Sequence, residues 1–188
     1  MNASKIQNKS TLKKDIKEIF YKGVINKQIS LSIVNIGDNL KNTIEQVISK
    51  EIDGKCITEG YIKPGSIKLI SYSSGLIDGG NIVFSVLLEC LICYPTEGMI
   101  INCIIKNITK AGIRAQTNDD PSPVIIFLAK EHHKNIKSFT SLKEEESIQV
   151  KVIGQRFELN DKYISIIGEL IEKKRSKQFS KKKLVIRN

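Results

Sequence analysis

The second half of the chain is divided by turn residues into five short apolar segments, and this division constrains the fold more than any other feature. Ile148, Val150 and Val152 alternate with polar residues, the period-two pattern of a strand that buries one face. Residues Thr109–Gly112 form a turn that predicts a hairpin. Five short strands of this kind are typical of a closed OB barrel. The five segments are 97–108, 113–116, 124–128, 147–154 and 163–168.

The first half of the chain predicts an antiparallel sheet with one packed helix. Apolar residues recur at helical spacing within residues 38–52, which predicts an amphipathic helix. Tyr94-Pro95 supplies a break after the last of the strand-like segments. The expected fold is therefore an α+β N-terminal domain followed by an all-β five-stranded OB-fold barrel. The strand-like segments of the first half are 28–33, 54–57, 67–72 and 81–93.

Positive charge is concentrated at the end of the chain. The net charge is +10, and residues 173–188 hold eight Lys and Arg with no acid. Such a run is typical of a solvated end, an interaction arm or a localisation signal, and it does not by itself establish nucleic-acid binding. The expected organisation is a basic N-terminal extension (1–18), an α+β domain (19–94), a barrel domain (95–172) and a basic C-terminal tail (173–188).

No segment indicates a membrane protein or an enzyme. The apolar runs are shorter than the roughly 18 to 20 residues that cross a bilayer, and the lysine-rich start lacks a secretory signal, so we expect a soluble intracellular protein. Cys90 and Cys93 have metal-like spacing, but residues three apart on a strand face opposite sides. His132 and His133 have no triad partners. We therefore expect no catalytic residues, no metal and no cofactor.

Several short motifs occur in an order that resembles a known family. The motifs are Ile36–Leu40 at the start of the helix, Glu51–Cys56, Glu59–Ile62, Asp78–Asn81 before a long strand, and Tyr94–Gly98 at the entry to the barrel. Over about residues 20–172 the chain resembles the larger stalk subunit of multisubunit RNA polymerases, which is the seventh subunit of RNA polymerase II and its archaeal and viral counterparts.

The resemblance implies a non-catalytic subunit that docks on the polymerase core, pairs with a smaller helical stalk subunit and faces nascent RNA with its barrel. By position, the core-docking tip would be Gly60, Tyr61, Ile62, Lys63, Pro64 and Gly65, with the Tyr61 ring as its anchor. The same residues would form an ordinary turn without the resemblance.

RNA binding by the barrel requires cations near the strand face and rings on which bases stack. Phe127 lies in an apolar run and is expected in the core, so few rings remain, and we expect weak, salt-sensitive contact with RNA. Lys106, Lys110 and Arg114 cluster about one hairpin and are the preferred candidates. The candidate RNA-binding residues are Lys106, Lys110, Arg114, Lys130, Lys151 and Arg156.

Two other functions fit parts of the sequence. A translation-linked OB-fold RNA-binding module explains the barrel and tail but leaves the N-terminal sheet without a role, and an RNA-processing accessory subunit is a third hypothesis. The chain looks most like homologues of large cytoplasmic DNA viruses. This resemblance is drawn from the two lysine-rich extensions, the abundance of isoleucine, lysine and asparagine, and the segments 120–123 and 129–133 taken together. That resemblance implies work at cytoplasmic replication sites and presence in the virion; a cellular homologue would be nuclear.

Overall fold

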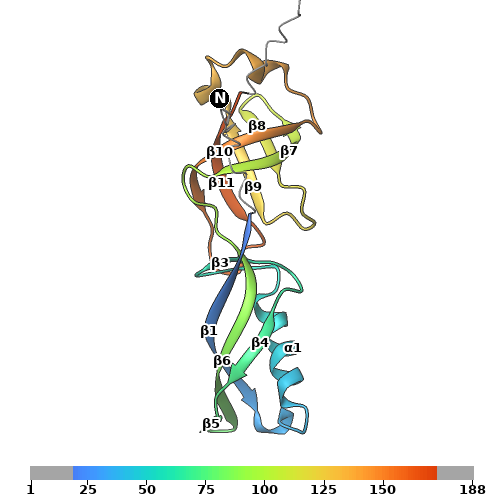
Figure 1. Cartoon of the computed structure of the whole chain (residues 1–188), viewed down its shortest axis with the longest axis vertical. Coiled ribbons are helices and arrows are strands. Elements are labelled where there is room, and N and C mark those ends of the chain that lie inside the picture. The colour runs from blue at the N-terminus through green and yellow to red at the C-terminus, as the bar shows by residue number, and fades with distance from the viewer. Residues whose placement is uncertain (1–18, 173–188) are drawn as a thin grey trace, which may run out of the picture.

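The structure is a computed structural model that describes residues 19–172. Figure 1 shows an elongated molecule in which a sheet with one helix lies at one end and a barrel at the other. The expected extension 1–18 and tail 173–188 lie outside the described residues. The boundary expected at Tyr94 stays a prediction, although one strand ends at Cys93 and the next begins at Ile100.

Two long strands form the axis of the N-terminal sheet. β1 and β6 pair antiparallel without a register shift, from Phe20 opposite Cys93 to Ser32 opposite Asn81. The strands β3, β4 and β5 pair with the other edge of β6, and β2 pairs with β3. The strands are β1 (Phe20–Ser32), β2 (Cys56–Ile57), β3 (Gly60–Ile62), β4 (Lys68–Tyr72), β5 (Leu76–Asp78) and β6 (Asn81–Cys93).

One helix covers one face of this sheet, as the apolar spacing predicted. α1 (Leu40–Ile52) buries Ile44, Ile48 and Ile52 in a cluster with alternate residues of β1 and β6, among them Ile29 and Leu88. A 3-10 turn, η1 (Ile33–Asn35), joins β1 to the segment before the helix. The N-terminal unit is therefore two layers, one of them a single helix.

The second half of the chain forms the predicted five-stranded barrel. The strands close in the order β10-β11-β9-β8-β7, in which only β9 and β11 run parallel. This confirms an α+β unit followed by an OB-fold barrel. The strands are β7 (Ile100–Ile108), β8 (Gly112–Gln116), β9 (Val124–Ala129), β10 (Ser147–Arg156) and β11 (Ile164–Leu170), with the turns η2 (Lys130–His133) and η3 (Lys137–Ser141) between β9 and β10.

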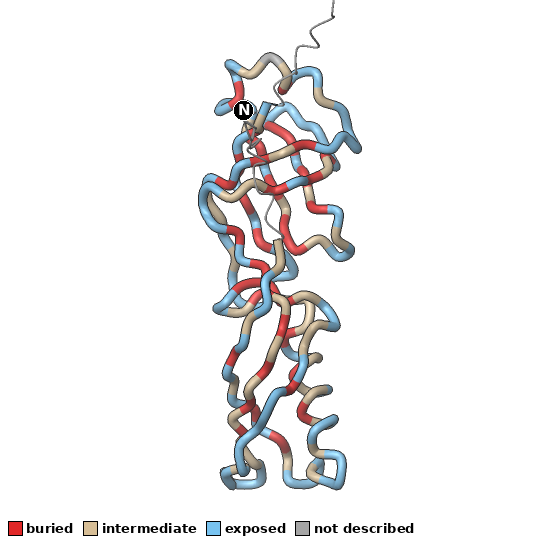
Figure 2. Tube along the Cα trace, viewed as in Figure 1, coloured by how far each residue is buried: buried red, intermediate tan, exposed pale blue. Residues whose placement is uncertain are grey.

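The two units share a packed junction, which we call the waist: Cys56, Tyr61 and Cys93 of the sheet with the barrel loop 157–161. The three sheet residues are buried in the same cluster as the barrel core. The Cys56 N–H donates to the Asp161 carbonyl at 2.8 Å, and the Asn160 N–H donates to the Cys56 carbonyl at 2.9 Å. Figure 2 shows buried residues on the segments that cross this junction. The waist joins the sheet and barrel by backbone hydrogen bonds as well as by apolar packing.

The cysteines are buried thiols on opposite faces, as the strand geometry predicted. Cys90 packs in the core beneath the helix and Cys93 in the barrel cluster. Burial raises the pKa of Cys90 to about 11 and of Cys93 to about 12, because the thiolate loses its hydration. Within residues 19–172 no three His, Cys, Asp or Glu side chains are grouped to hold a metal ion. No helix in this described range has the length and apolar character needed to cross a membrane.

Three strands differ from the sequence-based expectation. β3 is a strand where a turn was expected, because its residues pair with β2 and with the end of β6. β1 begins at Phe20 rather than at residue 28. Gly23 and Asn26 weaken the local strand pattern of this first part, but pairing with β6 keeps it in an extended conformation. The short strand β5 was not predicted at all. It forms because the Gly79-Gly80 turn folds Leu76–Asp78 back onto the start of β6.

Candidate nucleic-acid interface

Strand β9 presents its aromatic ring to the outside of the barrel. Val124, Ile126 and Leu128 are buried, while Phe127 between them is 40% exposed. The expectation that Phe127 lies in the core was wrong, because the closed barrel buries only alternate residues of an apolar run. The alternation itself was the signal that could have placed this ring outside.

The exposed ring lies in a row of outward-facing residues across the barrel, the Phe127 row: Asn107, Arg114, Phe127 and Ile167. Arg114 of β8 is directly opposite Phe127, and Ile167 of β11 is its partner on the other side. Asn107 of β7 is opposite Arg114. Directly opposed residues on one face have Cβ atoms about 4.5 to 5.5 Å apart, so the ring has a cation on one side and an apolar side chain on the other.

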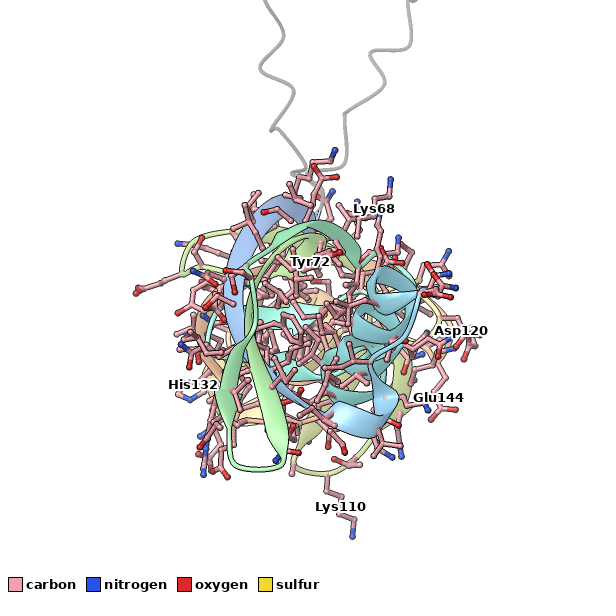
Figure 3. The ribbon with its side chains drawn as sticks, turned by 90° about the horizontal axis from the view of Figure 1, so that it is seen from below. Lys68, Tyr72, Lys110, Asp120, His132 and Glu144 are labelled. Atoms are coloured by element: carbon pink, nitrogen blue, oxygen red, sulfur yellow. The ribbon has the colours of Figure 1, made fainter. Side chains whose placement is uncertain are left out.

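Two more of the predicted cations lie at the end of the barrel that is farther from the waist. Lys110 is in the β7–β8 turn. The Lys130 N–H donates to the carbonyl of Ala111, the residue after Lys110, at 3.0 Å. Lys110 projects away from the body into solvent (Figure 3). Lys110, Arg114 and Lys130 make no ion pair within residues 19–172. These three therefore form the part of the predicted set that the structure brings together.

The other three predicted cations are separated from this group or already paired. The Lys106 Nζ lies 3.0 Å from a Glu145 carboxylate oxygen, and the Arg156 Nη2 lies 3.0 Å from Glu158. Lys151 is opposite an acidic residue of β11. The ion pairs of Lys106 and Arg156 lower the net positive charge that these two side chains offer to a phosphate.

The barrel as a whole carries no excess of positive charge. Residues 95–172 contain 10 Lys and Arg against 11 Asp and Glu. Residues 19–94 contain seven Lys and seven Asp or Glu, so the positive net charge of the protein comes from the sequence on either side of residues 19–172. A ligand on the barrel meets local cations rather than a basic surface.

The predicted docking segment lies at the waist, where its first three residues are buried. Gly60, Tyr61 and Ile62 form β3, and the exposed fraction of Tyr61 is 0%. A Cβ on Gly60 would lie 2.4 Å from the Cys93 carbonyl oxygen, so only glycine fits. Burial raises the pKa of Tyr61, whose hydroxyl is enclosed without a hydrogen-bond partner among residues 19–172. The expectation that Tyr61 is a surface anchor was wrong, because its ring fills the core of the waist.

The following turn is exposed at Pro64 and Gly65 and is held by hydrogen bonds to Asp53. The Gly65 N–H donates to both carboxylate oxygens of Asp53, at 2.9 and 3.1 Å. The Lys63 ammonium lies 4.9 Å from the centre of the Phe20 ring. Pro64 and Gly65 remain at the surface. Docking through this turn stays a prediction.

A second accessible surface, which the sequence reasoning missed, lies at the end of the sheet farthest from the barrel. We call it the apolar end: Ile33, Val34, Leu76 and Ile77. Val34 is 87% exposed and Ile77 is 77% exposed. The Ile33 N–H donates to the Gly80 carbonyl at 3.2 Å, which holds η1 against the β5–β6 turn. The sequence signal for this surface was the two pairs of apolar residues, Ile33-Val34 and Leu76-Ile77, which stand beside turns and outside the apolar pattern of the helix.

The sheet face away from the helix is also uncovered within residues 19–172. Val24 of β1 is exposed, and Leu87 and Leu91 of β6 are half-buried on the same face. Lys22 and Glu89 form an ion pair of 3.0 Å across it. This face therefore offers apolar side chains between charged ones, a pattern that suits contact with another protein chain.

Comparison with known proteins finds relatives across both units, although no family model matches. A protein of Acanthamoeba polyphaga mimivirus whose name describes it as a DNA-directed RNA polymerase subunit is 22% identical over 170 residues, covering 82% of this chain and 83% of that protein. DNA-directed RNA polymerase II subunit 7 of Arabidopsis thaliana is 21% identical, covering 80% and 98%. DNA-directed RNA polymerase II subunit RPB7 of Glycine max is 21% identical, covering 76% and 88%. The resemblance indicated by the motifs is confirmed.

Proposed function

We propose that this chain, as a relative of RNA polymerase subunits, is a non-catalytic stalk subunit of a DNA-dependent RNA polymerase. The observation that carries the proposal is similarity to named polymerase subunits along at least three quarters of the chain, which includes both the sheet unit and the barrel. Its partners would be the polymerase core subunits, a smaller helical stalk subunit and nascent RNA. Its role in transcription is to dock on the core, to pair with the smaller stalk subunit and to guide the nascent RNA.

Docking on the core takes place mainly through the apolar end. Val34, Leu76 and Ile77 each expose more than seven tenths of their surface, so burying them against a partner removes apolar area from water. The turn at Pro64-Gly65 is a second contact of the docking unit and presents mainly backbone. The segment beginning at Gly60 contributes by fixing that turn, while Tyr61 acts from inside the waist.

The smaller stalk subunit pairs with the uncovered face of the sheet. Val24, Leu87 and Leu91 provide apolar contacts there, and the Lys22–Glu89 pair provides a polar rim. A helix laid across the strands would bury these side chains as α1 buries those of the opposite face. The two faces of the sheet would then be covered by one helix each.

RNA meets the barrel on the β8–β9 side. Arg114, Lys110 and Lys130 are exposed there without ion pairs in the described range, and strands 2 and 3 of an OB barrel are its usual oligonucleotide-binding face. Because phosphate contacts carry no sequence information, the contact would be tolerant of RNA sequence. The place of work follows the polymerase: the nucleus for a cellular enzyme, and cytoplasmic replication sites and the virion for a viral one.

Affinity purification of the full chain from its native source, followed by mass spectrometry, tests the proposal. We expect two very large polymerase subunits and one small helical protein to remain bound at moderate salt. The double variant V34D/I77D should release the large subunits, because two carboxylates replace apolar contacts. Ile153→Asp, at an exposed apolar residue of β10 in the barrel, is the matched control and should retain them. Recovery of ribosomal proteins in place of polymerase subunits would reject the stalk function in favour of a translation-linked module.

A further inference from the structure

We propose that Phe127 and Arg114 form a subsite for one unpaired base of single-stranded RNA, in which the base stacks on the ring and the guanidinium holds the adjoining phosphate. The inference rests on the proposed function only in taking RNA as the ligand of the barrel. It assigns the principal binding contact to stacking, whereas the sequence pattern had assigned it to cations.

The geometry of the Phe127 row matches what an unpaired base requires. The ring is exposed on β9, and Arg114 is opposite it on the neighbouring strand. Ile167, which is 53% exposed, borders the ring on the other side and extends the apolar floor. A base has two π faces and can stack on such a ring whatever its identity, so the subsite needs no base-specific hydrogen bonds.

Arg114 is free to take the phosphate. It makes no ion pair in the described part of the chain, whereas Lys106 nearby is held by both oxygens of Glu145. A planar guanidinium binds phosphate in a bidentate manner and also stacks on aromatic faces. Lys110 and Lys130, at the far end of the same two strands, lie where the RNA backbone would leave the face.

The balance of charge favours a stacked base over a charge-driven contact. Residues 95–172 hold slightly more acids than bases, so the barrel lacks the excess of positive charge from which purely electrostatic binding derives. An oligonucleotide held mainly by stacking would depend weakly on salt. A protein partner would need a wider apolar surface, and Arg114, Asn107 and Gln116 are polar neighbours on this face.

Fluorescence anisotropy with the full chain and labelled twelve-nucleotide oligo(U) and oligo(A) tests the subsite, at several salt concentrations. Phe127→Ala should weaken binding about 5- to 150-fold with the dependence on salt unchanged. Phe127→Trp should bind at least as tightly as the wild-type chain. Arg114→Gln should lower the slope of log affinity against log salt by about one. Ile153→Ala, an exposed apolar residue of β10, is the matched control and should bind normally.

Wild-type affinity in the Phe127→Ala chain would overturn the subsite, and so would a Phe127→Trp chain as weak as the alanine variant. Loss of a polymerase subunit from the purified complex, with RNA affinity unchanged, would show that the face docks protein and would also overturn it. The outcome is separable from the stalk function, because every Phe127 variant should still co-purify with the large polymerase subunits through the apolar end.

Discussion

Replacing His133 should destabilise the barrel more than its position in a surface turn indicates. The side chain is 2% exposed, and its ring stacks on Phe139 with centroids 4.6 Å apart and planes 15° apart. Nδ1 lies 2.6 Å from the Ala129 carbonyl, so it must donate, and Nε2 accepts the Leu170 N–H at 3.0 Å. The neutral ring thereby ties η2 to the ends of β9 and β11.

The cost of His133→Ala follows from these contacts. A buried Leu170 N–H left without an acceptor costs about 1 to 3 kcal/mol. The lost ring stack costs about 0.5 to 1.5 kcal/mol more. We expect a fall of about 2 to 4 kcal/mol in the free energy of unfolding. His133→Phe keeps the stack and removes both hydrogen bonds, so it should lose about 1 to 3 kcal/mol.

Urea unfolding followed by circular dichroism measures both variants, and hydrogen exchange of the Leu170 amide reports the broken bond directly. His132→Ala is the matched control, because His132 is exposed in the same turn and should change stability by less than about 0.5 kcal/mol. A His133→Phe chain as stable as the wild type, with unchanged exchange at Leu170, would refute the role of the hydrogen bonds.

Three further outcomes are expected. Gly60→Ala should lower the free energy of unfolding in urea by about 2 kcal/mol or more, because its Cβ would meet the Cys93 carbonyl. Gly65→Ala, which has open space around it, should lower that free energy by about 1 kcal/mol. Equal losses in the two variants would contradict the steric argument. Cys56 and Cys93 should resist Ellman's reagent in the folded protein, and rapid labelling at neutral pH would refute their burial. The free energy of unfolding should fall as pH rises from about 9 towards 12, because in that window the thiols ionise only in the unfolded chain. RNA crosslinking should fall more for the pair Lys110→Ala and Arg114→Ala than for Lys106→Ala, since Glu145 already neutralises Lys106; an equal loss would show that the ion pair opens on binding.

Much of the fold was predictable because local pattern and tertiary packing agree. The helix at Leu40–Ile52 and the barrel strands follow directly from apolar periodicity and turn residues. Strand β5 escaped prediction because only its partner β6 makes it a strand. The start of β1 at Phe20 was missed for the same reason, since pairing with β6 is a contact between residues far apart in sequence.

The candidate sites were less predictable because they depend on register and on burial. Phe127 has the same apolar neighbours whether it faces in or out, and only the closed barrel decides between the two. Tyr61 sits beside a Pro-Gly turn that reads as exposed, yet the waist encloses its ring. The pairing of Lys106 with Glu145 joins residues 39 positions apart, which composition does not reveal.

The contacts of the waist also bear on how the sheet and barrel would move together. The Cys56 backbone is hydrogen-bonded to the backbone of Asn160 and Asp161, and the Tyr94 ring packs edge-on against the Phe157 ring with centroids 6.0 Å apart. The sheet and barrel are therefore not joined by a freely rotating linker. If the apolar end docks as proposed, the sheet and barrel would move as one body about that end. A small tilt there would sweep the far barrel through a larger arc, so the orientation of the barrel would be set by a surface at the opposite end of the protein.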